Sequence, residues 1–172
     1  VIPKIAGVFL GQEGQFLGMG AAVPDWFWEG DAVWQETMNT AQGRGRLPDF
    51  FNSYRSLWLD HKKYSYQKLR NGSYRHFVPN HYDLGYLLVS YGREKYGTDF
   101  WTKVTDDALA YKGIVYPFQK AVKRHAGIKY KQFVADAFTF YQQKMNIDTS
   151  TTYQTLQPLT KPSRNNVTAY RY

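Results

Sequence analysis

The residues of this chain with the clearest chemical potential are two carboxylates in an aromatic segment. Glu29 and Glu36 stand seven residues apart in the run from Pro24 to Thr37, which also contains three tryptophans. On an α-helix that spacing is nearly two turns, so the two acids share one face. Because the face is both acidic and apolar, we expect its carboxylates to point into an interior or a cleft. A charge in such a place requires a partner, such as Arg, Lys, a backbone N–H group or a metal ion.

This segment resembles the second metal motif of the gluzincin metallopeptidases, a zincin-like family, which reads Trp-x-x-Glu-Gly-x-Ala-x-Tyr-x-Glu. The matching residues are Trp26, Glu29, Gly30, Ala32, Trp34 and Glu36, with Trp34 in place of the commoner Tyr. The resemblance implies that Glu29 is the third zinc ligand. The other two ligands and the catalytic Glu of that family come from an upstream His-Glu-x-x-His helix. Residues 1–28 contain no His, and the four histidines lie downstream without the i, i+4 spacing: His61, His76, His81 and His125.

A second resemblance lies in Tyr82-Asp83-Leu84-Gly85. It is similar to the Tyr-x-x-Gly that opens a helix after the zinc-ligand Glu in aminopeptidase-like gluzincins, where the Tyr hydroxyl stabilises the oxyanion. The resemblance, which covers roughly residues 22–145, therefore implies a catalytic role for Tyr82. It also implies that Glu36 and Asp31 orient the metal ligands or bind a positive group. Trp26, Trp34 and His81 are candidates for a substrate cleft, although core packing is the simpler interpretation of the two tryptophans.

The function implied by the resemblance is peptide-bond hydrolysis by metal-activated water in a zinc metallopeptidase-like protein. Zinc is the expected cofactor of the full-length protein, and a peptide or protein is the expected substrate. With two ligands and the general base missing, this chain alone is expected to be inactive and without zinc. The alternatives are a non-catalytic scaffold and a peptide- or glycan-binding domain derived from a peptidase.

Similar segments precede β-propeller modules in exported bacterial proteins, which implies a periplasmic, cell-surface or secreted location and a possible C-terminal β-propeller. The polar residues 146–172 are expected to form a linker or the start of such a following module, with a first strand at 168–172. The chain opens on Val1 without an initiator Met, so we expect a fragment or a processed product.

The elements that must position these residues are predicted to be helices, which makes the expected fold mainly α, a helical subdomain over residues 1–145. The first helix, over residues 4–20, contains several glycines that suggest close packing, and a core stripe of Phe9, Phe16 and Leu17. Asp25 is the predicted N-cap of the helix that carries the acids. Later helix ends are indicated by Asn80 as N-cap, Gly97 as stop, Pro117 at a first helical position and Gly127 after a last turn.

Composition excludes several classes of protein. A chain of 172 residues without Cys can form neither disulfides nor thiolate metal sites, and it has no apolar run long enough to span a bilayer. The net charge of +8 favours acidic partners. Basic and aromatic residues alternate from His61 to Pro79, which predicts either a loop on the cleft rim or a polyanion-binding surface. No nucleic-acid partner is expected, because no nucleic-acid-binding module is recognisable.

Overall fold

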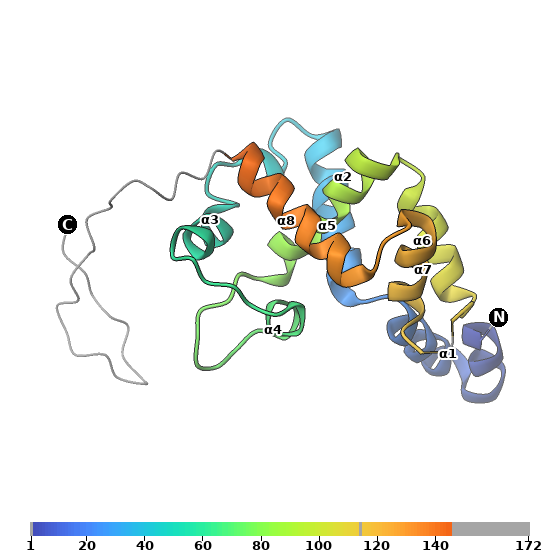
Figure 1. Ribbon diagram of the computed structural model, residues 1–172. Coiled ribbons are helices and arrows are strands. Elements are labelled where there is room, and N and C mark those ends of the chain that lie inside the picture. Colours follow the sequence, from blue (N-terminus) through green and yellow to red (C-terminus); the bar gives the residue numbers. More distant parts are fainter. Residues whose placement is uncertain (1, 114, 146–172) are drawn as a thin grey trace.

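A computed structural model describes residues 2–113 and 115–145, and helices make up the regular structure of this part of the chain (Figure 1). The mainly α fold is thereby confirmed, whereas the predicted linker and strand at 146–172 lie outside the described residues. In chain order the elements are α1 (Ile2–Ala22), α2 (Asp25–Asn39), the 3₁₀ turn η1 (Arg44–Arg46), α3 (Asn52–Leu59), α4 (Tyr66–Asn71), α5 (His81–Tyr96), α6 (Phe100–Leu109), α7 (Pro117–Ala126) and α8 (Tyr130–Lys144).

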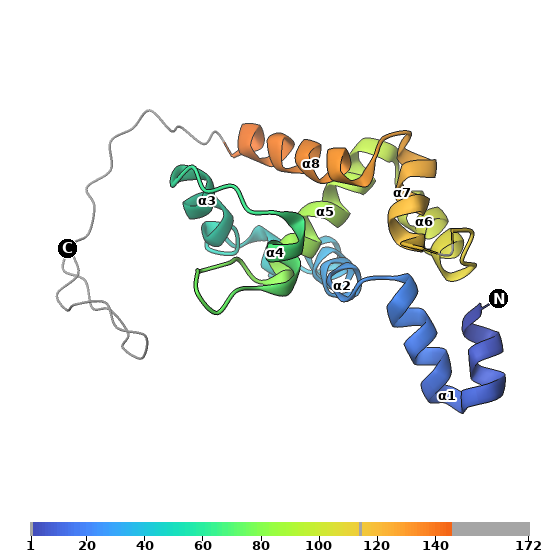
Figure 2. The ribbon, with the colours of Figure 1, turned by 60° about the horizontal axis from the view of Figure 1, so that its bottom comes forward.

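Helix α5 is the centre of the molecule. It contacts α2, α4, α6 and α8, and its residues 83–89 are all buried (Figures 1 and 2). Aromatic side chains fill the space around it. Trp101 of α6 is 1% exposed, donates its indole N–H to the Val89 carbonyl at 2.8 Å, and stacks on Phe118 with ring centroids 5.8 Å apart. Trp101 therefore links α6 to α5 and, through Phe118, to α7.

The helix ends confirm most of the predicted signals. The Asn80 side chain accepts a hydrogen bond from the Asp83 N–H at 2.9 Å, which caps α5, and Gly97 ends that helix at φ 97°. Pro117 opens α7, and Gly127 follows it in the left-handed conformation that glycine adopts without strain. The predicted Asp25 cap is wrong by one residue, because Pro24 takes the extended N-cap conformation and Asp25 is the first helical residue.

Helix α1 contradicts the predicted core stripe. Gly11 has φ 67° and breaks the element into two arms, which lie side by side in Figure 2. Phe9, Phe16 and Leu17 are 80%, 70% and 71% exposed, so they are not core residues in this structure. The second arm touches the body of the molecule through Gly18, whose carbonyl accepts a hydrogen bond from the Tyr111 hydroxyl at 2.6 Å.

The basic segment from His61 to Pro79 contains a short helix, α4, as well as loop. The side chain of Ser65 caps α4 by accepting from the Lys68 N–H at 3.3 Å. Leu69, which is 2% exposed, anchors the helix in the core. Most of the basic residues of the segment remain at the surface. Among the described residues, no helix has both the length and the apolar character needed to cross a bilayer.

Candidate functional site

The two segments that carry the gluzincin resemblance meet at a pair of glycines. A Cβ on Gly30 of α2 would lie 2.1 Å from the carbonyl carbon of Gly85 in α5, and a Cβ on Gly85 would lie 2.1 Å from the Trp26 carbonyl oxygen. The two backbones are thus in direct contact, and only glycine fits at either position. Because Glu29 precedes Gly30 and Tyr82 stands one helical turn before Gly85, this contact brings the two side chains together.

The carboxylate of Glu29 lies against the hydroxyl of Tyr82. As the hydrogen-bond acceptor for that hydroxyl, and then through its negative charge, Glu29 raises the pKa of Tyr82. Glu29 itself is partly exposed, and no Lys, Arg or His nitrogen of the described residues lies within 4 Å of its carboxylate. The predicted ligand and the predicted catalytic Tyr therefore share one site at the molecular surface.

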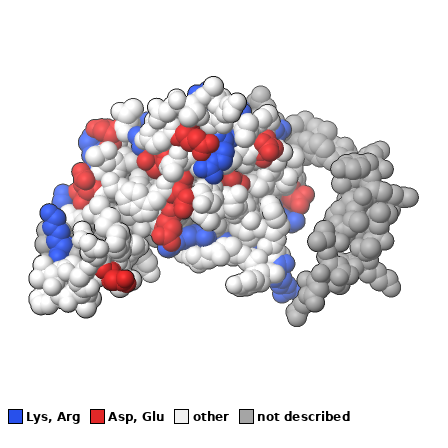
Figure 3. Space-filling model, turned by 180° about the vertical axis from the view of Figure 1, so that it is seen from behind, with Lys and Arg blue, Asp and Glu red and all other residues white. Residues whose placement is uncertain are grey.

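Glu36 reaches the same site through an arginine. Its carboxylate accepts from the Arg44 Nε at 2.8 Å and from the Arg44 backbone N–H at 3.1 Å, and these bonds hold the pKa of Glu36 below its ordinary value. The Arg44 guanidinium lies 5.4 Å from the centroid of the Tyr82 ring. Glu29 and Glu36 thus share a face, as predicted, but Glu36 is half of an ion pair. On the face seen in Figure 3, acidic and basic side chains lie next to one another.

Asp31 and Trp34 both contact Arg93 of α5. Asp31 accepts from an Arg93 Nη at 2.7 Å, and the guanidinium lies 4.1 Å from the centroid of the Trp34 ring. Arg93 also donates to the Thr98 carbonyl at 2.9 Å, so it is held from three directions. The positive group predicted for Asp31 is therefore a side chain of the same chain, and Trp34 serves as the surface on which that side chain packs.

The other two residues predicted for a substrate cleft lie in contrasting places. Trp26 is 1% exposed and donates its indole N–H to the Tyr66 hydroxyl at 2.6 Å, so it is a core residue and lines no cleft. A tryptophan at this helical position faces α6 and α7, and burial of its large apolar ring outweighs any role at the surface. His81 is exposed, and its ring centroid lies 4.5 Å from that of Tyr82.

A pocket of about 470 Å³ opens beside Tyr82. Its apolar walls are Phe50, Phe77 and Val78, and Arg44 supplies positive charge at its edge. Asp83 also lines it but is buried, accepts a hydrogen bond from the Ser53 hydroxyl at 2.5 Å, and has a pKa raised by that burial. The pocket is large enough to receive an amino-acid side chain, and Tyr82 is part of its wall.

Arg44 is the residue of this site that the sequence reasoning missed. It belongs to the basic loop Gly43-Arg44-Gly45-Arg46, which lies directly on α2: a Cβ on Gly43 would fall 2.3 Å from the Cα of Thr37. The Gly45 N–H also donates to the Thr37 hydroxyl at 3.0 Å. The alternating glycines were the sequence feature that could have indicated this role of Arg44. They permit a loop to approach a helix closely, which places the arginine between them next to that helix.

The residues of the candidate site can supply one of the protein ligands of a zinc ion. Glu29 offers a carboxylate with no basic partner among the described residues, but within residues 2–113 and 115–145 no three His, Asp or Glu side chains gather closely enough to hold a metal ion. Comparisons of the chain with protein-family models, with curated proteins and with solved structures found no match.

Proposed function

We propose that this chain is the helical part of a gluzincin-like zinc metallopeptidase, with Glu29 as a zinc ligand and Tyr82 facing the substrate carbonyl. The observation that carries the proposal is the contact between these two side chains, which the sequence separates widely and the Gly30–Gly85 contact brings together. Their roles were assigned by two separate motifs. Their meeting in space is what one shared reaction centre requires.

The charges on α2 support the choice of Glu29 over its neighbours. Asp31 is paired with Arg93 and Glu36 with Arg44. A carboxylate neutralised by a guanidinium is a poor metal ligand, because the metal must displace a charge-assisted hydrogen bond. Glu29 contacts only a neutral hydroxyl donor among the described polar partners, so it is the acid of this face that is best able to coordinate a cation.

Tyr82 suits a role as hydrogen-bond donor. A tyrosine hydroxyl is protonated near neutral pH, and Glu29 raises the pKa of this one further. A phenol has one proton to donate, so in the proposed reaction this proton leaves Glu29, once Glu29 binds zinc, for an oxygen that gains negative charge during attack on a carbonyl. Arg44 lies beside the Tyr82 ring and is paired with Glu36, and the adjoining pocket, whose walls include Phe50, Phe77 and Val78, can receive a substrate side chain.

The chemistry that zinc supplies when bound is a water of pKa about 7 and a polarised carbonyl. The proposal requires two histidine ligands and a general base from a part of the protein other than the described residues. Their expected source is a His-Glu-x-x-His helix.

Zinc content tests the ligand role directly. We expect the full-length protein to hold about one zinc ion per chain, as a four-coordinate site with Glu29 as one ligand requires. Glu29→Gln should lose that zinc, as measured by mass spectrometry of the metal after dialysis. Glu36→Gln is the matched control, since it makes the same Glu-to-Gln change at a second position on the same face of α2. This variant should keep the zinc. Unchanged zinc in Glu29→Gln would overturn the proposal.

The role of Tyr82 is tested by Tyr82→Phe, which removes one hydroxyl and keeps the ring that packs against Arg44. We expect kcat for peptide hydrolysis to fall by about 10²–10³-fold with zinc content and KM nearly unchanged, because one oxyanion donor is lost. Equal activity in the variant would exclude the role. A full-length protein that folds, lacks zinc and lacks activity would instead support the alternative, a non-catalytic scaffold.

A further inference from the structure

The basic segment from His61 to Pro79 is a region that the proposed reaction does not use. Lys63, Lys68, Arg70 and Arg75 form no ion pair within 4 Å among the residues that the structure describes. The charge of Lys68, followed by desolvation and the charges of Arg75 and Lys62, lowers the pKa of His76. The segment therefore carries an uncompensated positive field around α4.

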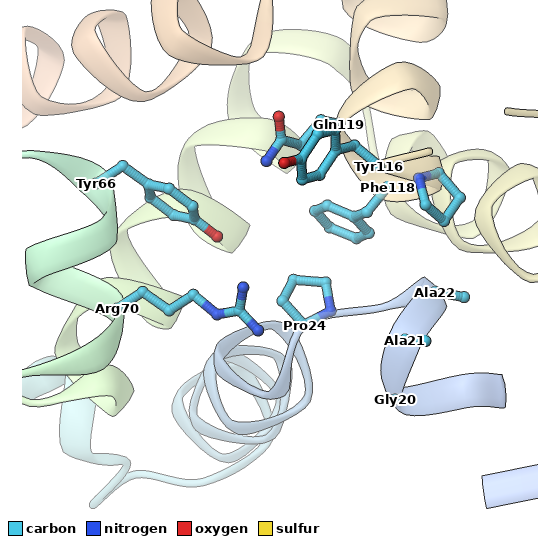
Figure 4. Close-up of a pocket in the computed structure, with 10 residues that line it drawn as sticks. Gly20, Ala21, Ala22, Pro24, Tyr66, Arg70, Tyr116, Phe118 and Gln119 are labelled. Carbon is cyan, nitrogen blue, oxygen red and sulfur yellow. The ribbon is translucent and has the colours of Figure 1, made fainter. Parts of the chain in front are cut away.

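Two adjoining pockets run along α4. The smaller, of about 70 Å³, lies between the end of α1, α4 and the start of α7; the larger, of about 440 Å³, lies between α4 and α8. Tyr66 and Gln119 line both pockets, so the two are neighbours, and together we call them the α4 groove. Figure 4 shows Tyr66 and Arg70 pointing from α4 toward Phe118 and Gln119 of α7.

The walls of the α4 groove combine three kinds of group. Arg70 and Lys131 supply positive charge at separate places, Gln67 and Gln119 supply amides, and Val134, Ala135 and Phe138 supply apolar surface. No Asp or Glu of residues 2–113 and 115–145 lines either pocket. Such walls complement a ligand that carries negative charge, hydrogen-bonding groups and at least one apolar group.

The aromatic rings of the larger pocket are already packed, which bears on the class of ligand that it takes. The Lys68 Nζ lies 3.7 Å from the centroid of Tyr64, Tyr66 meets Tyr130 edge to face at 5.1 Å, and Phe138 packs on Tyr54 at 5.6 Å. Sugars and nucleotide bases bind chiefly by stacking on open ring faces. Amides and an aliphatic wall instead suit a peptide backbone with an apolar side chain.

We propose that the α4 groove binds an extended peptide segment in which apolar residues are flanked by Asp or Glu. The apolar side chain lies against Val134 and Ala135 of α8, the backbone meets Gln67 and Gln119, and the acidic side chains lie near Arg70 and Lys131. This binding needs no zinc and does not depend on the proposed reaction.

The test is fluorescence anisotropy of labelled peptides with the complete 172-residue chain in the presence of a zinc chelator. The probe Glu-Asp-Leu-Phe-Asp-Glu should bind. Two analogues should bind at least about tenfold more weakly, a difference of about 1.4 kcal/mol: Gln-Asn-Leu-Phe-Asn-Gln, which lacks the charges, and Glu-Asp-Ser-Ser-Asp-Glu, which lacks the apolar side chains.

The position of the site is tested by two pairs of substitutions with equal change in net charge. Arg70→Gln with Lys131→Gln should weaken the probe at least about tenfold. Lys95→Gln with Lys123→Gln, at exposed positions outside the groove, should leave it unchanged. Ala135→Glu, which adds an acid to an exposed wall position, should abolish binding while the circular dichroism spectrum stays helical.

Three results would overturn the proposal. The first is equal weakening of probe binding by both pairs of charge substitutions, and the second is binding of the neutral analogue as tight as that of the probe. The third is tighter binding of a short single-stranded oligothymidine or a sulfated oligosaccharide, if Ala135→Glu also abolishes that binding. Because the chelator removes any metal, each result concerns the groove alone and leaves the zinc test of Glu29 unaffected.

Discussion

Helix α1 and the α2–α5 pair are both apolar and both contain glycine, yet they behave in opposite ways. In the pair, Gly30 and Gly85 stand opposite each other and allow the two backbones to touch. In α1, Gly11 and Gly20 have no heavy atom within 4 Å of a built Cβ, and neighbouring apolar side chains such as Phe9 are exposed. Glycine in an apolar helix therefore indicates close packing only where a second element lies directly against it, as Gly85 lies against Gly30.

The consequence for function follows from the same contrast. The α2–α5 contact fixes the backbones that carry Glu29 and Tyr82. The geometry of the candidate site therefore depends on glycine at positions 30 and 85, where a side-chain methyl group would not fit.

The α1 arms expose large apolar side chains, namely Val8, Phe9, Leu10, Phe16 and Leu17. Apolar patches of this kind are uncommon on isolated soluble domains.

The largest effect is expected from substitution at the glycine contact. Gly85→Val should prevent cooperative folding, because its Cβ would meet backbone atoms of Trp26 and Gly30 that cannot move aside without separating the helices. Gly20→Ala is the matched control on α1 and should change the free energy of unfolding by less than about 1 kcal/mol, in the stabilising direction. Thermal unfolding followed by circular dichroism distinguishes the two. A stable, cooperative Gly85→Val variant would contradict the described helix contact.

A smaller but still large effect is expected for a buried aromatic residue beside α5. Trp101→Ala should lower the free energy of unfolding by about 3–5 kcal/mol, through loss of burial and the cavity left behind. Phe9→Ala, on the exposed arm of α1, should change it by no more than about 0.5 kcal/mol. Urea titrations of both variants measure the difference. Similar losses for the two would mean that α1 is packed in solution and that the contrast between the regions is false.

The smallest of the three effects concerns charge at the α6–α7 corner, on which the second arm of α1 rests. Asp107 is buried and contacts Lys112 at 2.5 Å, His125 at 3.0 Å and Arg124. The hydrogen bond from Lys112 is the main reason why the pKa of Asp107 is far below its ordinary value. Asp107→Asn should therefore cost about 1–3 kcal/mol at neutral pH.

The pH dependence provides the check on this charge effect. A depressed folded-state pKa contributes stability above the unfolded pKa of about 3.9, and this stability is lost as the pH falls through the folded value. The unfolding free energy of the unmodified protein should therefore fall below about pH 4 more steeply than that of Asp107→Asn. Parallel pH profiles for the two proteins would show that the Asp107 contacts do not contribute to stability.

The boundaries of the helices could be predicted because their signals are local. Asn80 caps α5 with its own side chain, and Gly127 ends α7 through its own backbone conformation. These interactions span three or four residues, so they depend little on the rest of the fold. Asp25 was misassigned because two adjacent residues could both serve as the cap. Pro24 is the N-cap because its ψ of 146° is extended, whereas Asp25 is already helical.

The candidate site could be predicted only as a set of residue types. The spacing of Glu29 and Glu36 correctly indicated a shared face, and the two motifs named Glu29 and Tyr82, whose side chains meet in the structure. The sequence did not indicate that Arg44 would pair with Glu36, or that Arg93 would pair with Asp31. An ion pair depends on the side chains that distant segments bring within about 4 Å, and no local pattern encodes that distance.

By itself, then, the sequence determined that the chain forms helices, where most of them begin and end, and which two glycine-containing motifs are candidates for chemistry. Only the tertiary structure decided that Glu29, unlike Asp31 and Glu36 on the same helix, has no basic partner among the described residues, and that the apolar side chains of α1 face outward. The physical reason is the distance along the chain over which each kind of interaction acts. Capping and helix periodicity act over one or two turns, whereas burial and charge pairing depend on how α2, α5 and their neighbours pack against one another.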